Sequence, residues 1–182
     1  LSRSVEYTYR KFVNLVAEGR NMTYKEVDAI AQGRVWTAED ALNNGLIDAI
    51  AYNVYVNPDP AVGSDSNDGM TSNTPFLTIN HALSLVYADS LNPMTIHLSG
   101  TYSPSVPGAV FPIILPNFVF IVGEDPNTTI IDAQGNSRVF HFFDSYQNGI
   151  ENITVTGGYD AYYANNLSWG SGGGIYCNNA SP

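Results

Sequence analysis

The chain has 182 residues, of which 13% are charged and 44% are hydrophobic, so it is long enough for one domain or two small ones and too apolar to be disordered throughout. A net charge of -10 and an isoelectric point near 4.4 repel phosphate backbones and argue against nucleic acid as a partner. No apolar run approaches the roughly 20 residues of a membrane span, no signal peptide opens the chain, and a lone cysteine, Cys177, permits neither an internal disulfide nor a zinc site of its own.

The composition changes near Tyr52. Residues 1–52 contain six basic and seven acidic residues, a net charge of -1, and no proline. Residues 53–182 contain one basic residue, Arg138, and ten acidic residues, a net charge of -9, together with all ten prolines. This change predicts two unlike units, residues 1–52 and residues 53–182.

The first unit opens with a predicted amphipathic helix that ends at Gly19. Its apolar residues recur at helical spacing, namely at Val5, Tyr9, Phe12, Val13 and Val16. A unit of this size buries too little apolar surface to be stable alone, so we expect it to lean on other protein.

Two further helices and two short strands are predicted in the same unit. Thr23 and Glu26 form a capping box that starts the second helix, and Thr37 starts the third in a similar way. Residues 34–36 and 46–50 are the strand candidates.

Three motifs follow one another along this unit. They are Phe12-x3-Val16-x3-Arg20-x-Met22-Thr23, Ala31-x-Gly33-Arg34-Val35-Trp36-Thr37 and Asp40-Ala41-x3-Gly45-Leu46-Ile47-Asp48. In this order they resemble the C-terminal end of the signal peptide peptidase (protease IV) family. The resemblance implies a fragment of a crotonase-like α/β fold, from a parent peptidase whose serine nucleophile is activated by a lysine base and whose substrate is a peptide.

The resemblance places both catalytic residues upstream of the matched segment, so this chain is expected to contain neither. The two lysines, Lys11 and Lys25, stand at positions where the family does not place its base. We interpret them as solvated charges on helices.

Two series of apolar pairs recur at intervals of 22 residues in the second unit. One series consists of Ile96 and Leu98, Phe118 and Phe120, and Phe140 and Phe142. The other consists of Ile131 and Ala133, Ile153 and Val155, and Ile175 and Cys177. Residues two apart on a strand share a face, so each series predicts an inward column over successive turns of a parallel β-helix. Ile131, Ile153 and Ile175 would form one buried ladder, with Cys177 pointing inward as a small apolar side chain.

A capping helix is predicted before the first turn, over residues 78–88, with Thr78 as its N-cap. Further motifs of this unit are Tyr55-Val56-Asn57, Gly63-Ser64-Asp65-Ser66-Asn67-Asp68-Gly69, Thr74-Pro75-Phe76-x-Thr78-Ile79-x-His81-Ala82-Leu83, Gly100-Thr101-Tyr102-Ser103 and Gly172-Gly173-Gly174-Ile175-Tyr176-Cys177. Together they resemble the N-terminal part of a pectate-lyase-like β-helix domain, as found in secreted bacterial proteins.

This second resemblance implies a mainly β fold: an incomplete right-handed parallel β-helix of about four turns with an N-terminal capping helix. It also implies an extracellular or cell-envelope location of bacterial type. The superfamily includes lyases, hydrolases, epimerases and binding proteins, so the resemblance does not specify an activity.

Four polar residues lie close together along the second unit and form a candidate substrate site for polysaccharide. They are Asp132, Arg138, His141 and Asp144. An acid and a base in a groove are what β-elimination of a polysaccharide requires. A salt bridge of Arg138 within a turn is the favoured alternative.

Two more groups of residues have a structural and a functional interpretation. His97 and His141 are two periods apart, so we expect them in one outward column with Val119 between them, as surface histidines. An aromatic loop, which contains Tyr159, Tyr162, Tyr163 and Trp169, either stacks on sugars or covers the side of the solenoid.

Asp59, Asp65 and Asp68 crowd one loop, which suggests either a calcium site or a set of Asx turns. The spacing fits no EF-hand loop, so we favour the turns and expect no cofactor.

Three interpretations of the whole chain remain. In the first, it is a catalytically incomplete tail of a signal peptide peptidase joined to a β-helix. In the second, it is the start of an extracellular β-helix that binds or cleaves polysaccharide. In the third, it joins fragments of two unrelated proteins, because Leu1 is not an initiator methionine and the solenoid has no closing cap.

Overall fold

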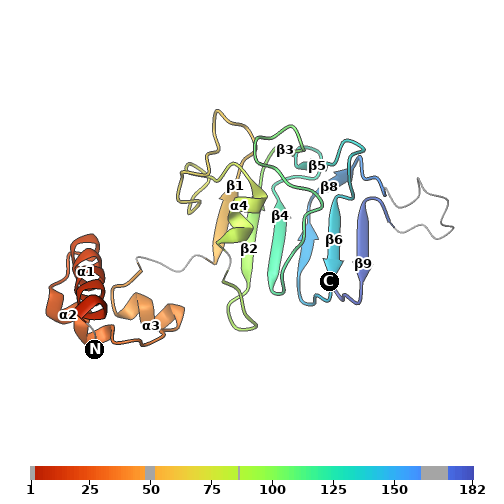
Figure 1. Cartoon of the computed structure of the whole chain (residues 1–182). Helices are drawn as coiled ribbons and strands as arrows, with labels where there is room; N and C mark the ends of the chain where they lie inside the picture. The colour runs from red at the N-terminus through yellow and green to blue at the C-terminus, as the bar shows by residue number, and fades with distance from the viewer. Residues whose placement is uncertain (1–2, 48–51, 86, 161–171) are drawn as a thin grey trace. The chain divides into compact units, whose positions relative to one another are not determined.

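In the computed structural model the chain divides into two compact units, Leu1–Ile50 and Ala51–Pro182. The structure describes residues 3–47, 52–85, 87–160 and 172–182. Within these ranges nine strands, all paired in parallel, outnumber four helices (Figure 1). None of the described helices combines the length and the apolar character that a membrane crossing needs.

The described part of the first unit contains three helices. They are α1 (Arg3–Arg20), α2 (Tyr24–Ile30) and α3 (Ala38–Asn43). The predicted capping box is confirmed, because the Thr23 hydroxyl accepts from the Glu26 backbone N–H while the Glu26 carboxylate accepts from the Thr23 backbone N–H at 2.7 Å. Thr37 caps α3, as predicted, by accepting from the Asp40 backbone N–H.

The predicted strand over residues 34–36 is wrong. This segment folds back over the end of α2, where the Trp36 indole N–H donates to the Ile30 carbonyl at 2.9 Å. A strand needs a neighbour for its backbone hydrogen bonds, and no strand lies in the described part of this unit. Residues 46–47 also form no strand, and the rest of that candidate, residues 48–50, lies outside the described residues.

The first unit has a small core. Among the described residues its buried members are Val13, Ala17 and Val27. Val5 and Phe12, which belong to the predicted apolar face, are 51% and 55% exposed. The predicted amphipathic helix is present as α1. The other described residues of this unit bury only part of its apolar face.

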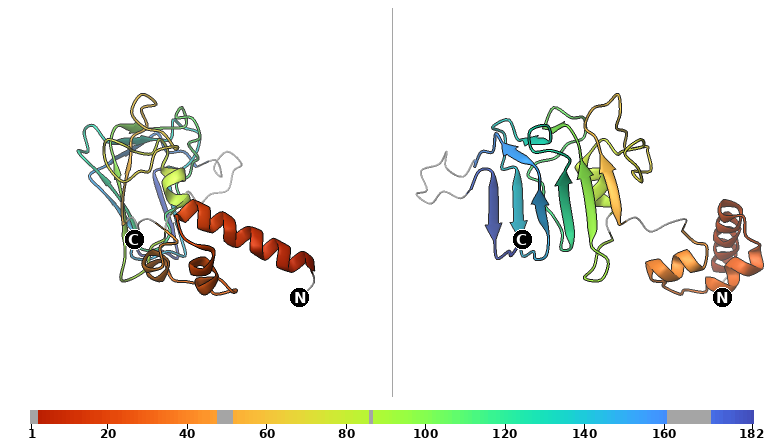
Figure 2. Two further views of the ribbon diagram at one scale, coloured as in Figure 1. Left: turned by 90° about the vertical axis from the view of Figure 1, so that its left-hand side faces the viewer. Right: turned by 180° about the vertical axis from the view of Figure 1, so that it is seen from behind.

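The second unit consists of three parallel sheets. Sheet A contains, in spatial order, β1 (Asn53–Val56), β2 (Met94–Leu98), β4 (Val119–Gly123) and β7 (Gly149–Glu151). Sheet B contains β3 (Thr101–Tyr102), β5 (Ile130–Asp132) and β8 (Thr154–Thr156), and sheet C contains β6 (Phe140–Phe143) and β9 (Ile175–Asn178). From β4 onward the chain passes through sheets A, B and C twice in that order, and every sheet pairing is parallel (Figure 2).

Sheet A does not follow the predicted repeat of 22 residues. Ile96 lies beside Ile121, and Ile121 lies beside Ile150, so 25 and then 29 residues separate the inward positions. Phe120 pairs with Thr95, on the opposite face from these isoleucines. The predicted inward column through Phe120 is therefore wrong, because turns of unequal length join the strands and a shift of one residue reverses the face of every side chain.

The predicted ladder of three isoleucines is also wrong, although the parallel pairing is confirmed. Ile131 lies beside Val155 in sheet B, whereas Ile175 lies beside Phe140 in sheet C. Ile153 precedes β8 and is half-buried against the core.

Cys177 is exposed, although it was predicted to point inward as a small apolar side chain. Its register partner Phe142 is buried, which means that Cys177 points toward the same side of the sheet. Among the described strands β9 is the outermost of sheet C, so an inward direction does not bring burial there.

The capping helix is confirmed in a shorter form as α4 (Ile79–Ser84), with Thr78 as its N-cap. Ile79 and Ala82 are fully buried in the core of the second unit. Viewed along the stack of strands, α4 lies at the β1 end (Figure 2).

Candidate functional site

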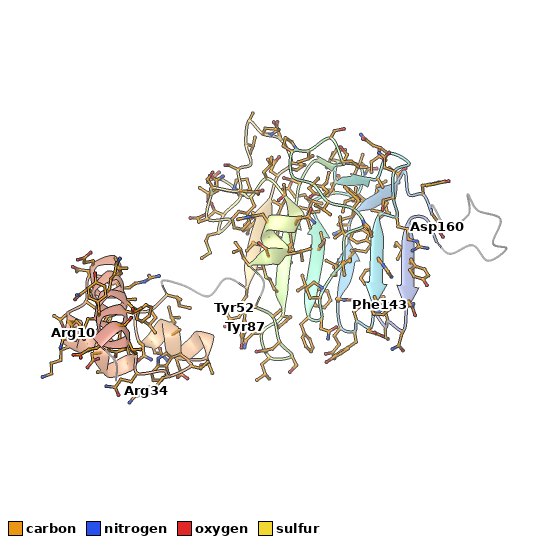
Figure 3. All side chains as sticks on the ribbon, in the orientation of Figure 1. Arg10, Arg34, Tyr52, Tyr87, Phe143 and Asp160 are labelled. Atoms are coloured by element: carbon orange, nitrogen blue, oxygen red, sulfur yellow. The ribbon has the colours of Figure 1, made fainter. Side chains whose placement is uncertain are left out.

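A cluster of charged and aromatic side chains lies on the outer face of sheet C. His141 and Tyr176 are register partners on β6 and β9, with ring centroids 4.9 Å apart. The Arg138 guanidinium lies 4.2 Å from the centroid of the Tyr176 ring and donates to the Asp160 carboxylate at 2.8 Å. Asp160 is labelled in Figure 3. The structure therefore brings together two of the four predicted site residues, Arg138 and His141.

The cluster is largely closed to solvent. The side chains of Arg138 and Asp160 are 20% and 9% exposed, so the arginine charge is already matched by a nearly buried carboxylate. The Nε2 atom of His141 is buried and has no hydrogen-bond partner among the described residues. This geometry fits a structural ion pair better than an acid and a base facing a substrate.

The other two predicted site residues lie elsewhere. Asp132 ends β5 in sheet B, where its carboxylate accepts from the Gln134 backbone N–H at 2.8 Å. Asp144 follows β6, and its carboxylate accepts from the Asn179 side-chain amide at 2.6 Å. Asp132 is separated from the cluster because it lies on sheet B, whereas Asp144 lies beyond the end of β6 and bonds to Asn179.

A hollow of about 430 Å³ lies on the outer face of sheet A. The side chains that line it come from β2, β4 and β7, and include Thr95, Phe120, Val122 and Glu151. Gly149, the register partner of Phe120, contributes no side chain, which leaves space beside the aromatic ring.

This hollow was missed in the sequence because β4 is apolar on both faces. In the run from Val119 to Val122, alternation does not decide which residues point inward. The 22-residue spacing then assigned Phe120 to the core. The one sign of the hollow in the sequence is Gly149, which begins β7 and contributes no side chain to the outer face.

The three aspartates of the 59–68 loop all serve local hydrogen bonds. Asp65 accepts from the backbone N–H groups of Leu77 and Thr78 at 2.9 Å, and from the Thr78 hydroxyl at 2.8 Å. Asp68 accepts from the Thr74 hydroxyl, which together with the Met70 backbone N–H holds its pKa below the usual value.

Asp59 makes an Asx turn by accepting from the Ala61 backbone N–H at 2.9 Å. In the ranges that the structure describes, no group of three acidic, histidine or cysteine side chains is arranged to hold a metal ion. The geometry therefore fits the turn interpretation of this loop.

In the first unit, Lys11 and Lys25 are both exposed on helices, as expected of solvated charges. An apolar hollow of about 290 Å³ lies among α1, α2 and the segment after them, with Phe12, Trp36 and Leu46 in its lining. It marks where the described residues of this unit leave part of the apolar face of α1 uncovered.

Comparison with known proteins divides the chain at nearly the same place as the structure. Residues 61–166, more than half of the chain, match a family described as "Protein of unknown function (DUF1565)". The chain belongs to the DUF1565 family. The DUF1565 match contains all the strands from β2 to β8, and with them the hollow on sheet A.

Residues 1–58, before the DUF1565 match, are similar to peptidase family S49. Protease 4 of Salmonella typhi is 53% identical over 47 residues, which are 26% of this chain and 8% of that protein. Protease 4 of Haemophilus influenzae is 43% identical over 54 residues, or 29% of this chain and 9% of that protein. The serine protease SPPA of Arabidopsis thaliana chloroplasts is 42% identical over 48 residues, or 26% of this chain and 7% of that protein.

The chain thus spans less than a tenth of the length of each of these three relatives. No solved structure matches it significantly.

Proposed function

We propose that residues 53–182 form about four turns of a right-handed parallel β-helix, capped by α4, that binds extracellular polysaccharide. Two successive passages of the chain through sheets A, B and C, β4 to β6 and β7 to β9, support this fold, because a parallel β-helix places one strand of each sheet in every turn. Right-handed crossovers are the rule for parallel strands. The continuous outer faces of such a stack suit an extended polymer.

We further propose that residues 1–52 are the C-terminal piece of a crotonase-like S49 peptidase domain and supply no catalytic group. In this proposal the parent peptidase cleaves peptides, while the chain itself is catalytically incomplete. The exposed helical positions of Lys11 and Lys25 support it, because a lysine base needs a desolvated position beside its serine.

Binding is preferred over cleavage for the second unit because of one observation. Its one arginine, Arg138, is held by Asp160 and by the ring of Tyr176, rather than being presented to a polymer. A lyase that uses Arg138 and His141, without Asp132 and Asp144, is the second candidate, supported by the proximity of Arg138 and His141 through Tyr176.

Affinity electrophoresis of the purified chain in gels containing neutral and acidic polysaccharides tests this proposal. We expect retarded migration in at least one gel and no release of shorter or unsaturated sugars. Migration unchanged in every gel contradicts binding, and unsaturated products that disappear in Arg138→Ala and His141→Ala establish the lyase instead.

Two further measurements test the rest of the proposal. Signal-peptide substrates should remain intact with the purified chain, and hydrolysis abolished by Lys11→Ala or Lys25→Ala contradicts the incomplete peptidase. Fractionation of cells producing the chain tests the proposed extracellular or envelope location, which the resemblance to secreted bacterial β-helices supports.

A further inference from the structure

We propose that the hollow on the outer face of sheet A binds a neutral glycan, one sugar ring of which packs on Phe120. This inference rests on the proposed polysaccharide binding and gives it a position and a substrate class. The site lies on a different sheet from the four residues that the sequence singled out.

The hollow has the size and the mixed lining of a ligand site. Its volume of about 430 Å³ falls within the range of roughly 300–1,000 Å³ that ligand pockets occupy. The half-buried side chain of Phe120 offers an apolar surface, while Thr95 and Glu151 add polar residues to the lining. The apolar face of a sugar ring packs on an aromatic ring, and its hydroxyls donate to and accept from such polar groups.

Gly149 lies next to the Phe120 ring and places no side chain in the hollow. A Cβ atom built at Gly149 would lie 3.5 Å from Cδ1 of Phe120, which is ordinary van der Waals contact. The backbone at Gly149, the first residue of β7, therefore has room for a Cβ atom. A branched side chain there would press on the Phe120 ring inside the hollow.

The same face continues toward β1 with a second aromatic surface. Tyr55 and His97 are register partners and stack with centroids 4.9 Å apart and ring planes 21° from parallel. Asn53 fixes the His97 ring through a 3.0 Å hydrogen bond between its Oδ1 and Nε2 of the histidine. Stacked strands lie about 4.8 Å apart, so rings on successive strands form an extended platform suited to a polymer.

The negative charge of the second unit favours a neutral polymer over an acidic one. Residues 53–182 carry a net charge of -9, and their one basic residue, Arg138, lies in the sheet C cluster against Asp160. Among the described residues that line the hollow, Glu151 is the charged one. A polymer of uronic acids would bring carboxylates to this acidic surface, so a glycan without carboxylates fits better.

The test measures the binding of cellohexaose and of hexagalacturonate to the full chain by isothermal titration calorimetry. Gly149→Val fills the hollow with a residue that favours strands, and Phe120→Ala removes the ring. Phe143→Ala removes an exposed aromatic ring on sheet C, away from the hollow, and is the matched control. Melting temperatures verify that each variant is folded.

We expect cellohexaose to bind, hexagalacturonate to bind at least tenfold more weakly, and both Gly149→Val and Phe120→Ala to weaken cellohexaose binding at least tenfold. Phe143→Ala should change it less than twofold. If Phe120→Ala unfolds, Gly149→Val decides alone.

Other outcomes separate this inference from the proposed function. Cellohexaose binding that survives Gly149→Val, or that is lost in Phe143→Ala, overturns the sheet A site and leaves polysaccharide binding in place. Stronger binding of hexagalacturonate overturns the neutral-glycan class. Failure to bind either hexamer overturns the inference, and the proposed function falls with it only if no polysaccharide gel retards the chain.

Discussion

The contacts that stabilise each unit join residues at different separations along the chain. In the first unit, capping bonds join residues three apart, such as Thr23 and Glu26, and the described core contains three buried residues. In the second unit, sheet neighbours such as Phe140 and Ile175 are 35 residues apart, and nineteen buried apolar residues form one core among the described residues. Local capping therefore forms helices with little core, whereas stacking forms a core from segments with weak local signals.

The largest expected effect is loss of a core side chain in the stack. Ile121→Ala removes a fully buried side chain between Ile96 and Ile150, so the free energy of unfolding of the second unit should fall by about 2–5 kcal/mol. Urea unfolding followed by circular dichroism measures it. Ile114→Ala, at a position 56% exposed, is the control and should change stability by less than about 0.5 kcal/mol. Equal losses in both variants would contradict a register that places Ile121 inside the stack.

The loop before the capping helix should depend on Asp65. Asp65→Ala leaves two backbone N–H groups and the Thr78 hydroxyl without their acceptor, at an expected cost of about 1–3 kcal/mol. Asp59→Ala loses an exposed turn bond and should cost less. Millimolar calcium should leave the melting temperature of the wild type unchanged, and a clear rise would restore the calcium interpretation of this loop.

The first unit should respond most to its caps. Thr23→Ala removes the capping hydroxyl of α2 and should destabilise that helix by about 1 kcal/mol, seen as a loss of helical circular dichroism. Thr23→Ser keeps the hydroxyl and serves as the control. No difference between the two variants would mean that the cap does not hold this unit.

Acid should weaken the same cap. The backbone N–H and hydroxyl of Thr23 lower the pKa of Glu26 in the folded chain, so the stabilisation is present above the unfolded value of about 4.3 and is lost as the pH falls through the lower folded value. Helicity of the wild type should therefore drop more between pH 5 and about pH 3 than that of Glu26→Gln. Glu18→Gln, away from any helix start, should follow the wild type.

The smallest effect is expected at Cys177. Because the side chain is exposed, Cys177→Ser should change stability by less than about 0.5 kcal/mol. A thiol reagent should label the native chain nearly as fast as the unfolded chain. Slow labelling of the native chain would mean that other protein covers the far side of β9.

The sequence predicted the features that depend on neighbours in the chain. The capping box at Thr23, the start of α3 at Thr37 and the cap of α4 at Thr78 were all found, because a cap is a bond between residues three apart. The parallel stack itself was also predicted from recurring apolar pairs.

The candidate sites were predicted less well. Arg138 and His141 both contact the ring of Tyr176. The sequence analysis did not predict that Tyr176 lies on that face. Asp132 and Asp144 lie apart from them, because the chain turns from sheet B to sheet C and then leaves it within thirteen residues. Each strand is about four residues long, and successive strands mostly belong to different sheets. Residues that are close in sequence therefore often lie on different sides of the molecule.

By itself, the sequence determined the change in composition near Tyr52, the helix caps, the net negative charge and the parallel, mainly β character of the second unit. The tertiary structure alone decided the register, and with it the face on which each side chain lies. The reason is physical: side chains alternate with a period of two, so turns of unequal length move Phe120 from the predicted core to the outer face without changing any local pattern. The exposure of Cys177 was decided in the same way, by its place on the outermost described strand rather than by its own chemistry.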